Sequence, residues 1–284
     1  MTVTTDAYHG DTSRITKTML ALYDDSPERY RATYLDKTLA VKEVKTAAKV
    51  GSLCHQIILE NKKLDDICVE YPPTCFTDTG RIRPVAAKAF ELECSPKLAI
   101  RPDIIQQVRR RVETVQSSQL GKLLAIENSD THREMQVDAD LWGLPCKCRP
   151  DIFFDMPDRI VVPDLKFGAY EPKDFARSAK RYKYYLQQAH YTAILMAVYG
   201  KPVQWMFLVG ELTEPYRFGQ RSYELRSTEI ARDYHEALVK RLSKSYETGS
   251  FADNYAEELC LAPWDLASAE DQEDPDENVE VGDE

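Results

Sequence analysis

Two carboxylates and a lysine lie at the ends of neighbouring predicted strands. The segment VPDLK (162–166) ends one strand, and strand alternation places Asp164 and Lys166 on one side of it, with Leu165 opposite. Thirteen residues before Asp164, the segment CRPD puts Asp151 on the neighbouring strand, and Glu134 opens the strand before that. Acids that converge beside a lysine bind hard divalent cations and bring a metal-activated water near the ammonium. Phosphodiester hydrolysis needs these groups; a surface ion pair is the alternative interpretation.

The elements that position these groups follow from a change in the spacing of apolar residues at position 134. Before it the spacing is helical and after it the spacing alternates, which predicts a helical N-terminal region followed by a sheet. We expect helices over 13–23, through Tyr30 after a Ser26-Pro27 cap, and over 41–60, 102–126, 177–199 and 228–246. We expect strands over 134–141, 146–154, 159–166, 203–209 and 222–225. This order predicts an α/β fold, and we place Arg109, Arg110 and Arg111 on the solvent side of their helix.

Charge divides the chain of 284 residues into a body and a tail. The formal net charge is −10, but residues 269–284 carry nine acidic side chains and no basic one. The remainder is nearly neutral, so we expect one domain over 1–268, helical over 1–130 with its sheet core over 131–250, and a disordered acidic tail over 269–284. One stretch of the body is basic enough to meet a phosphate backbone. Its basic residues are Lys173, Arg177, Lys180, Arg181 and Lys183.

Cysteine usage and hydropathy favour a cytoplasmic protein outside the membrane. Seven cysteines lie without a disulfide-like spacing, the first residues lack a secretory pattern, and no apolar run is long enough to span a bilayer. Cys146 and Cys148 share a strand face opposite Asp151, and Cys260 stands alone. We therefore interpret the cysteines as core thiols and expect no iron-sulfur cluster.

Several motifs, taken together and in order, resemble those of a known superfamily. CRPD, then PDLK, then YYLQQAHY resemble the PD-(D/E)xK nucleases, and within them the RecE-type exonucleases (exodeoxyribonuclease eight) of phages and prophages. These are relatives of the RecB nuclease domain and lambda exonuclease. The segments ITKTMLALYDDSPERYRATY and AAKVGSLCHQIILE resemble that group's opening helices and its glycine-to-histidine helix. The resemblance runs from about residue 8 to residue 245, and it implies a restriction-endonuclease-like core with a central mixed sheet flanked by helices.

The resemblance also implies roles for individual residues. Asp151, Asp164 and the backbone carbonyl of Leu165 become metal ligands, Lys166 orients or activates the attacking water, and Glu134 becomes an upstream acid. The implied ions are Mg²⁺, with Mn²⁺ able to substitute, and two per site.

Three further residues are assigned in the same way. His55 matches the histidine that RecB-like nucleases add to the metal site, and His132 is the rival candidate for this role. From the residues alone, His55 is equally well interpreted as a histidine that packs at the edge of an apolar helix face. Gln187 and Tyr191 are four apart on one helical face and match a Gln-x-x-x-Tyr motif beside the site. Without the resemblance, Tyr191 is ordinary core and Gln188 is the exposed glutamine. Phe167 departs from the family pattern, in which a small hydroxylated residue often follows the lysine.

The implied activity is a metal-dependent, ATP-independent exonuclease that digests linear double-stranded DNA from 5′ ends and leaves 3′ single strands for recombination by strand annealing. Such enzymes work with a RecT-like annealing recombinase and form rings, here a trimer or tetramer, in the cytoplasm of the bacterial host. Two alternatives remain: a catalytically silent module that binds DNA or protein, which the intact Asp151, Asp164 and Lys166 disfavour, and a structure-specific endonuclease on the same core.

Overall fold

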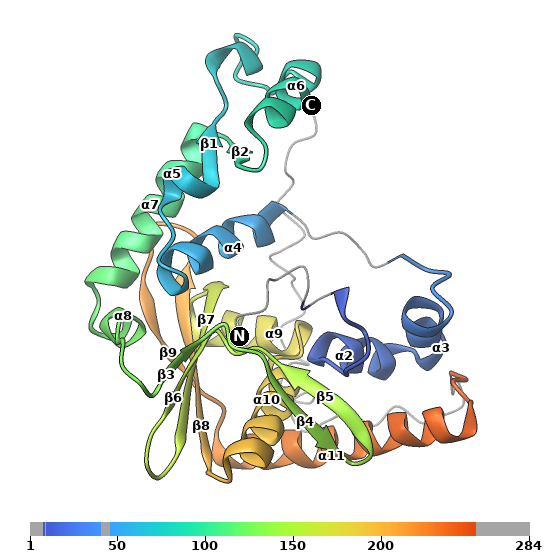
Figure 1. Ribbon diagram of the computed structural model, residues 1–284. Helices are drawn as coiled ribbons and strands as arrows, with labels where there is room; N and C mark the ends of the chain where they lie inside the picture. The colour runs from blue at the N-terminus through green and yellow to red at the C-terminus, as the bar shows by residue number, and fades with distance from the viewer. Residues whose placement is uncertain (1–7, 9, 41–45, 254–284) are drawn as a thin grey trace. The chain divides into compact units, whose positions relative to one another are not determined.

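The computed structural model describes residue 8, residues 10–40 and residues 46–253, without the side chains of residues 46–50 (Figure 1). Met1–Phe251 forms one compact unit. Cys260 and the predicted acidic tail lie outside the described residues, as does the part of the predicted 41–60 helix that precedes residue 46. Among the described helices, none is long and apolar enough to cross a bilayer.

A five-stranded mixed sheet forms the centre of the molecule, as predicted. Its order is β3-β6-β7-β8-β9, with β7 and β8 parallel and the other pairs antiparallel. The strands are β3 (Thr131–Arg133), β6 (Ile152–Asp155), β7 (Ile160–Gly168), β8 (Val203–Glu211) and β9 (Phe218–Arg221). Two smaller sheets accompany it: antiparallel β4 (Val137–Leu141) and β5 (Leu144–Cys148), and parallel β1 (Cys68–Glu70) and β2 (Leu98–Ile100).

Helices cover both faces of the central sheet because its strands are apolar on both sides. The helices are α2 (Lys17–Asp25), α3 (Pro27–Tyr30), α4 (Thr46–Leu59), α5 (Leu64–Ile67), α6 (Pro84–Cys94), α7 (Pro102–Ser117), α8 (Gln119–Leu124), α9 (Pro172–Arg181), α10 (Tyr184–Tyr199) and α11 (Leu225–Thr248). A π-helical turn (Arg31–Leu35) and a 3₁₀ turn (Pro73–Cys75) complete the set of described helical elements. The Ser26-Pro27 start is confirmed, since the Ser26 hydroxyl accepts a hydrogen bond from the backbone amide of Arg29.

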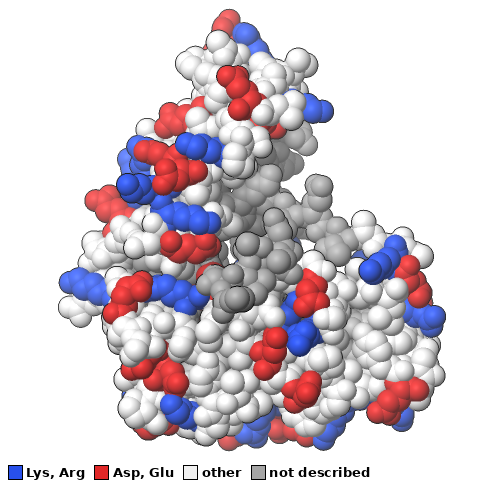
Figure 2. Space-filling view, viewed as in Figure 1, with Lys and Arg blue, Asp and Glu red and all other residues white. Residues whose placement is uncertain are grey.

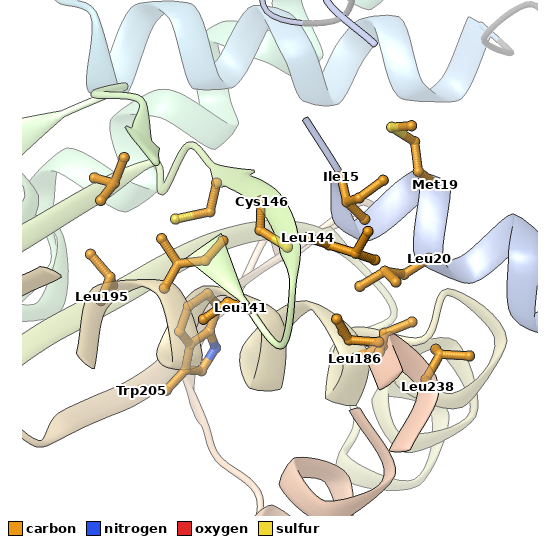
Figure 3. Close-up of a cluster of buried hydrophobic side chains, with 14 of the residues drawn as sticks. Ile15, Met19, Leu20, Leu141, Leu144, Cys146, Leu186, Leu195, Trp205 and Leu238 are labelled. Atoms are coloured by element: carbon orange, nitrogen blue, oxygen red, sulfur yellow. The ribbon is translucent and has the colours of Figure 1, made fainter. Parts of the chain in front are cut away.

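Alternation along the strands divides the core into two layers. Leu165 and Leu208 pack on one face with Leu59 of α4 and Val115 of α7. On the other face, Val162 and Phe207 join a larger cluster with residues of α2, α10 and α11. Figure 3 shows part of this cluster, in which Leu20 approaches Leu186 and Leu238; Ile15 and Met19 belong to the same cluster. Because Asp164 and Lys166 alternate with Leu165, they lie on the α10 side of the sheet.

Several predicted elements have different boundaries. The predicted helix over 102–126 is two helices, α7 and α8, separated at Ser118, which has an extended backbone. The predicted helix over 177–199 is two helices, separated at Lys183, which has a left-handed backbone (φ 50°). The predicted strand over 146–154 is also divided, into β5 and β6, because Pro150 and Asp151 leave one sheet for the other. The strand expected over 222–225 is wrong: β9 ends at Arg221 and α11 begins at Leu225.

The environment of Arg111 also differs from expectation. Arg109 and Arg110 are exposed, but Arg111 is only 5% exposed. Its guanidinium donates to the carbonyl of Leu212 and to the side chain of Gln107. These contacts, both made by Nη2, compensate the buried charge in part, while Nε and Nη1 have no hydrogen-bond partner among the described residues.

Candidate active site

Four of the six predicted catalytic residues and His55 line one pocket of about 380 Å³, whereas Asp164 and Gln187 are not among its lining residues. It lies where β7 ends beside α4, β5 and the connection from β3 to β4. His55, Glu134, Asp151, Lys166 and Tyr191 line it. The other lining residues are Tyr8, Gly51, Ser52, Gln56, Glu60, Arg149, Leu165 and Phe167.

One imidazole and two carboxylates form the centre of this pocket. His55, Glu134 and Asp151 each offer one ligand atom, and these atoms lie within 4.8 Å of one another. The Nδ1 atom of His55 is 3.6 Å from Oδ2 of Asp151, and the same oxygen accepts the backbone amide of Leu165 at 2.9 Å. The backbone of Leu165 is also a hydrogen-bond partner of His55. Leu165 thus fixes both the carboxylate and the imidazole to the end of β7.

Glu134 reaches the centre from a strained backbone position. It lies in the bend between β3 and β4 with φ 45°, so it does not open a strand as predicted. Its amide donates to the carbonyl of Asp151 at 3.1 Å, and its Oε2 lies 3.0 Å from Nε of Arg149. A left-handed conformation is unfavourable for a glutamate and is maintained by such surrounding contacts. Backbone strain at the position of a candidate ligand is typical of functional sites.

Asp164 and Lys166 form a buried ion pair beside the three central groups. Their side chains point to the same side of β7, as alternation predicts, and Nζ of Lys166 is 2.5 Å from Oδ2 of Asp164. Gln187 of α10 donates to the other carboxylate oxygen of Asp164 at 2.7 Å. Nζ of Lys166 also lies 5.3 Å from the ring centre of Tyr184. Asp164 is only 1% exposed, so its charge depends on these partners.

Burial and repulsion between neighbouring carboxylates raise the pKa of two acids of this site. Burial, reinforced by the charge of Asp151, raises the pKa of Glu134 to about 7. Burial likewise raises the pKa of Asp164 to about 7, against the opposing effect of Lys166. For Lys166, burial lowers the pKa, but Asp164 and Asp151 outweigh it and the net pKa is raised. The site therefore has more negative charge than its own cations neutralise.

These groups fit a hard divalent cation. Burial lowers the pKa of His55, so its imidazole is neutral at pH 7 and able to coordinate. Carboxylate oxygens with one imidazole suit Mg²⁺ or Mn²⁺, and a bound cation would relieve the repulsion that raises the pKa of Glu134 and Asp164. His55, Glu134 and Asp151 would hold the ion directly. Asp164 does not belong to this cluster, so its role as a metal ligand stays a prediction.

The structure separates the rival candidates of the sequence. His132 lies on β3 and its ring stacks on Phe153 at 4.6 Å, whereas among the described residues the cluster with Glu134 and Asp151 contains His55. Gln187 faces Asp164, while Gln188 is buried and points to Thr228. Tyr191 both lines the pocket and packs against Trp205, so it contributes to the core and to the site.

The predicted basic stretch lies on α9 and at its junction with α10. Lys173, Lys180 and Arg181 are exposed, and Arg177 pairs with Asp174 at 3.1 Å. Lys183 is held by Asp24 and Asp25 of α2 at 2.5 and 2.6 Å, so DNA would have to compete with two carboxylates for it. On the face shown in Figure 2, acidic and basic side chains of the described residues are interspersed. DNA binding by this stretch stays a prediction.

Several pocket residues were missed by the sequence analysis. Gly51, Ser52 and Gln56 lie on the same face of α4 as His55, which helical spacing alone makes apparent. Phe167, where a hydroxylated residue was expected, presents its ring to His55 at 6.2 Å. A Cβ at Gly210 of β8 would approach this ring to 2.6 Å, so the glycine is required for the position of Phe167. Tyr8 and Arg149 enter the pocket through tertiary contacts that carry no sequence pattern.

Comparison with known proteins agrees with this geometry. Among curated proteins, no relative matches the chain. A solved structure from Eubacterium rectale, described as a "Putative exonuclease", is similar with a TM-score of 0.59 and 14% identity over 95% of this chain and 99% of that one, which shows a shared fold. A second, SSO0001, matches at 12% identity over 85% of this chain and 93% of that one, with a TM-score of only 0.24. Residues 16–258 match the family described as a PDDEXK-like domain of unknown function, DUF3799, and the chain therefore belongs to this PDDEXK-like family.

Proposed function

We propose that the protein is a divalent-metal-dependent exodeoxyribonuclease that digests linear double-stranded DNA. The observation that carries the proposal is the grouping of His55, Glu134 and Asp151 within 4.8 Å, beside the Asp164–Lys166 pair. A silent binding domain has no need to bury an excess of carboxylates, since an uncompensated buried charge is destabilising. The PDDEXK-like family match and the fold shared with the Eubacterium rectale protein support the nuclease assignment.

Each side chain has a definite part in the proposed hydrolysis. A divalent cation, when bound, would polarise a phosphoryl oxygen and lower the pKa of the attacking water. His55, Glu134, Asp151 and Asp164 would bind it, with the carbonyl of Leu165 as a further ligand. Lys166 would align the water and offset the charge that develops at phosphorus. Gln187 would fix the rotamer of Asp164 through its 2.7 Å hydrogen bond.

The finer features of the activity come from the resemblance to RecE-type enzymes. We infer 5′→3′ digestion that leaves 3′ overhangs, two Mg²⁺ ions per site with Mn²⁺ as substitute, and no requirement for ATP. We also infer a cytoplasmic enzyme of phage or prophage origin, a RecT-like annealing partner and a trimeric or tetrameric ring. A ring holds its substrate by enclosure, which suits a body of nearly neutral net charge.

Digestion of linear and of closed circular DNA distinguishes the proposed activity from its alternatives. We would incubate the protein in Mg²⁺, without ATP, with a linear duplex and with a covalently closed duplex. Each end of the strands of the linear duplex would carry a label. We expect digestion of the linear form alone, with mononucleotides released first from the 5′ end. Cutting of closed circles would favour an endonuclease, and release from the 3′ end would reverse the polarity. DNA retention without cleavage in Mg²⁺ or Mn²⁺ would favour a silent binding module.

Lys166→Ala provides the matched catalytic variant. We expect it to bind Mn²⁺ and DNA but to lose roughly three or more orders of magnitude in rate, because the water is no longer aligned. Lys201→Ala is the control, since Nζ of Lys201 lies 2.5 Å from Asp155 in a pair of the same length outside the pocket. Equal activity of the two variants would remove Lys166 from the mechanism.

A further inference from the structure

A completely buried lysine fastens the N-terminal part of the chain to the site. Lys147 of β5 is 0% exposed and lies between the core residues Cys146 and Cys148. Its Nζ donates to the carbonyl of Tyr8 at 2.7 Å and to the carbonyl and Oδ2 of Asp11 at 2.6 and 3.1 Å. A buried ammonium is unfavourable unless it is compensated, so these oxygens and Lys147 depend on each other.

Backbone pairing continues this attachment. The amide of Ile15 donates to the carbonyl of Pro145 at 2.8 Å, and the amide of Lys147 donates to the carbonyl of Ile15 at 2.9 Å. Asp11 additionally accepts the amide of Ser13 at 2.9 Å. The chain around Asp11 to Ile15 therefore runs along β5 as an integral part of the catalytic core.

Tyr8 enters the pocket as a result of this attachment. It is 5% exposed, lines the pocket, and its hydroxyl is a hydrogen-bond partner of Tyr191. Two cations lie over its ring: Nζ of Lys147 is 4.7 Å and the guanidinium carbon of Arg149 is 5.0 Å from the ring centre. Both distances are in the range of attractive cation–π contacts.

Arg149 transmits this contact to a candidate metal ligand. Lys147 and Arg149 are two residues apart at the end of β5, so their side chains reach the same ring. Arg149 also contacts Glu134, whose Oε2 is 3.0 Å from Nε. These two side chains are only 11% and 15% exposed. Tyr8, Arg149 and Glu134 thus form a continuous contact from the N-terminal segment to the centre of the site.

We propose that Tyr8 is a positioning residue of the metal site, whose ring supports the Arg149 guanidinium and through it holds the Glu134 carboxylate beside His55 and Asp151. The inference deepens the proposed function, on which it rests for its catalytic consequence. An arginine side chain has many rotamers, and an adjacent aromatic face restricts them. Without the ring, the Arg149 guanidinium loses one of its supports and holds Glu134 less firmly, so the cation loses a well-positioned ligand.

The experiment measures cation binding separately from catalysis. Mn²⁺ affinity of the full-length protein would be determined by titration calorimetry, and kcat and KM on linear duplex DNA would be measured beside it. We expect Tyr8→Ala to weaken Mn²⁺ binding about tenfold and to lower kcat by a similar factor, with the KM for DNA nearly unchanged. Tyr8→Phe keeps the ring and should restore both values to near wild type.

Two further variants separate positioning from a loss of folding. Tyr8→Leu fills the volume without an aromatic face, and we expect a folded protein with the same weakened Mn²⁺ binding. Tyr170→Ala is the matched control, since its ring carries Arg217 at 4.5 Å and Arg221 at 4.9 Å but does not line the pocket. Its Mn²⁺ affinity should equal that of wild type.

The outcomes keep this inference apart from the proposed function. Wild-type Mn²⁺ affinity in both Tyr8→Ala and Tyr8→Leu would overturn the positioning role, whatever the activity. Mn²⁺ binding that depends on the Tyr8 ring in a protein that hydrolyses no DNA would retain the positioning role and refute the nuclease. An equal loss in Tyr170→Ala would show a general effect of removing a ring that contacts arginines, and would also overturn the inference.

Discussion

The pocket around His55 and the interior around His190 and His235 both contain buried titratable side chains, but their partners differ. Nδ1 of His190 lies 3.0 Å from Nε2 of His235, and Nε2 of His190 lies 3.2 Å from the carbonyl of Lys147. Burial lowers the pKa of His190 to about 4 and that of His235 to about 3. These rings are neutral at pH 7, and protein atoms are partners for three of their four ring nitrogens, while Nδ1 of His235 has no hydrogen-bond partner among the described residues.

In the pocket, like charges face one another instead. Glu134 and Asp151 share a space with His55, and the pKa of Glu134 is raised to about 7 in part by the neighbouring carboxylate. A buried polar group satisfied by the protein stabilises the fold, whereas one left facing like charge across a pocket favours a ligand. The comparison therefore predicts that changes in the pocket affect activity and cation binding, and that changes at the histidine pair affect stability.

The largest effect is expected from Asp151→Ala. Hydrolysis should fall by roughly 10³-fold or more, because a central cation ligand is lost. In metal-free buffer the variant should melt at or above the wild-type temperature, since carboxylate repulsion is removed. Thermal melts with and without Mg²⁺ check this, with Asp155→Ala of β6 as control. A Mg²⁺ shift equal to that of wild type would contradict the ligand role of Asp151.

His55→Ala should have a smaller effect on the same activity. We expect a loss of about tenfold to a hundredfold in Mg²⁺, with a larger fraction of activity recovered in Mn²⁺, which accepts nitrogen ligands better. Hydrolysis rates in the two metals, normalised to folded protein, measure this. Full activity in Mg²⁺ would leave His55 as a residue that packs against Phe167.

His235→Leu tests the other region. The substitution leaves Nδ1 of His190 without its partner, so the free energy of unfolding at pH 7 should fall by about 1–3 kcal/mol. Hydrolysis per folded molecule should not change, because His235 does not line the pocket. Urea denaturation and a DNA digestion assay on one preparation measure both quantities. A rate loss with unchanged stability would erase the distinction between the two regions.

The smallest expected effect is the change in stability with pH, to which the two regions contribute with opposite signs. The ordinary pKa of histidine is 6.5, so between pH 6.5 and about pH 4 these two histidines bind protons in the unfolded chain but not in the folded one. Through His190 and His235, the free energy of unfolding therefore falls as the pH falls. Glu134 and Asp164 have folded pKa values of about 7, above their ordinary 4.5 and 3.8, so folding favours their protonated forms. Their contribution makes stability rise as pH falls through the same window.

Two variants separate these contributions. In metal-free buffer, we compare the free energy of unfolding of each variant with that of wild type at pH 7 and at about pH 5. Lowering the pH should raise this difference by about 1–2 kcal/mol for His235→Leu and lower it by a similar amount for Asp164→Asn. Urea denaturation at both pH values measures the two differences. Shifts of the same sign would mean that one of the two pKa assignments is reversed.

The parts predictable from the sequence are those set by local periodicity. Alternation placed Asp164 and Lys166 on one side of a strand, and the Ser26-Pro27 pattern located a helix start; both are confirmed. The left-handed residues Glu134 and Lys183 were not foreseeable, because neither is a residue type that favours positive φ. Tertiary contacts override the intrinsic preference at these positions.

Long-range charge partners were equally hidden. The sequence around Arg111 predicts a surface arginine, yet the side chain is buried and donates to the carbonyl of Leu212, about a hundred residues away. Lys147 has the same character, and its partners Tyr8 and Asp11 precede it by a similar distance in the chain. No periodicity links such positions, so the role of Tyr8 in the pocket emerged only with the fold.

The wide spread of the pocket along the chain has a consequence for synthesis. Its lining begins at Tyr8 and is complete only at Tyr191, and β7 needs β8, which ends at Glu211, as its parallel partner. A nascent chain emerges from the ribosome in order, so its N-terminal two-thirds are exposed before the last pocket residues arrive. On the proposed function, hydrolytic capacity begins at a late step of synthesis, and we expect a truncated product that stops before α10, and so lacks Tyr191, to be inactive.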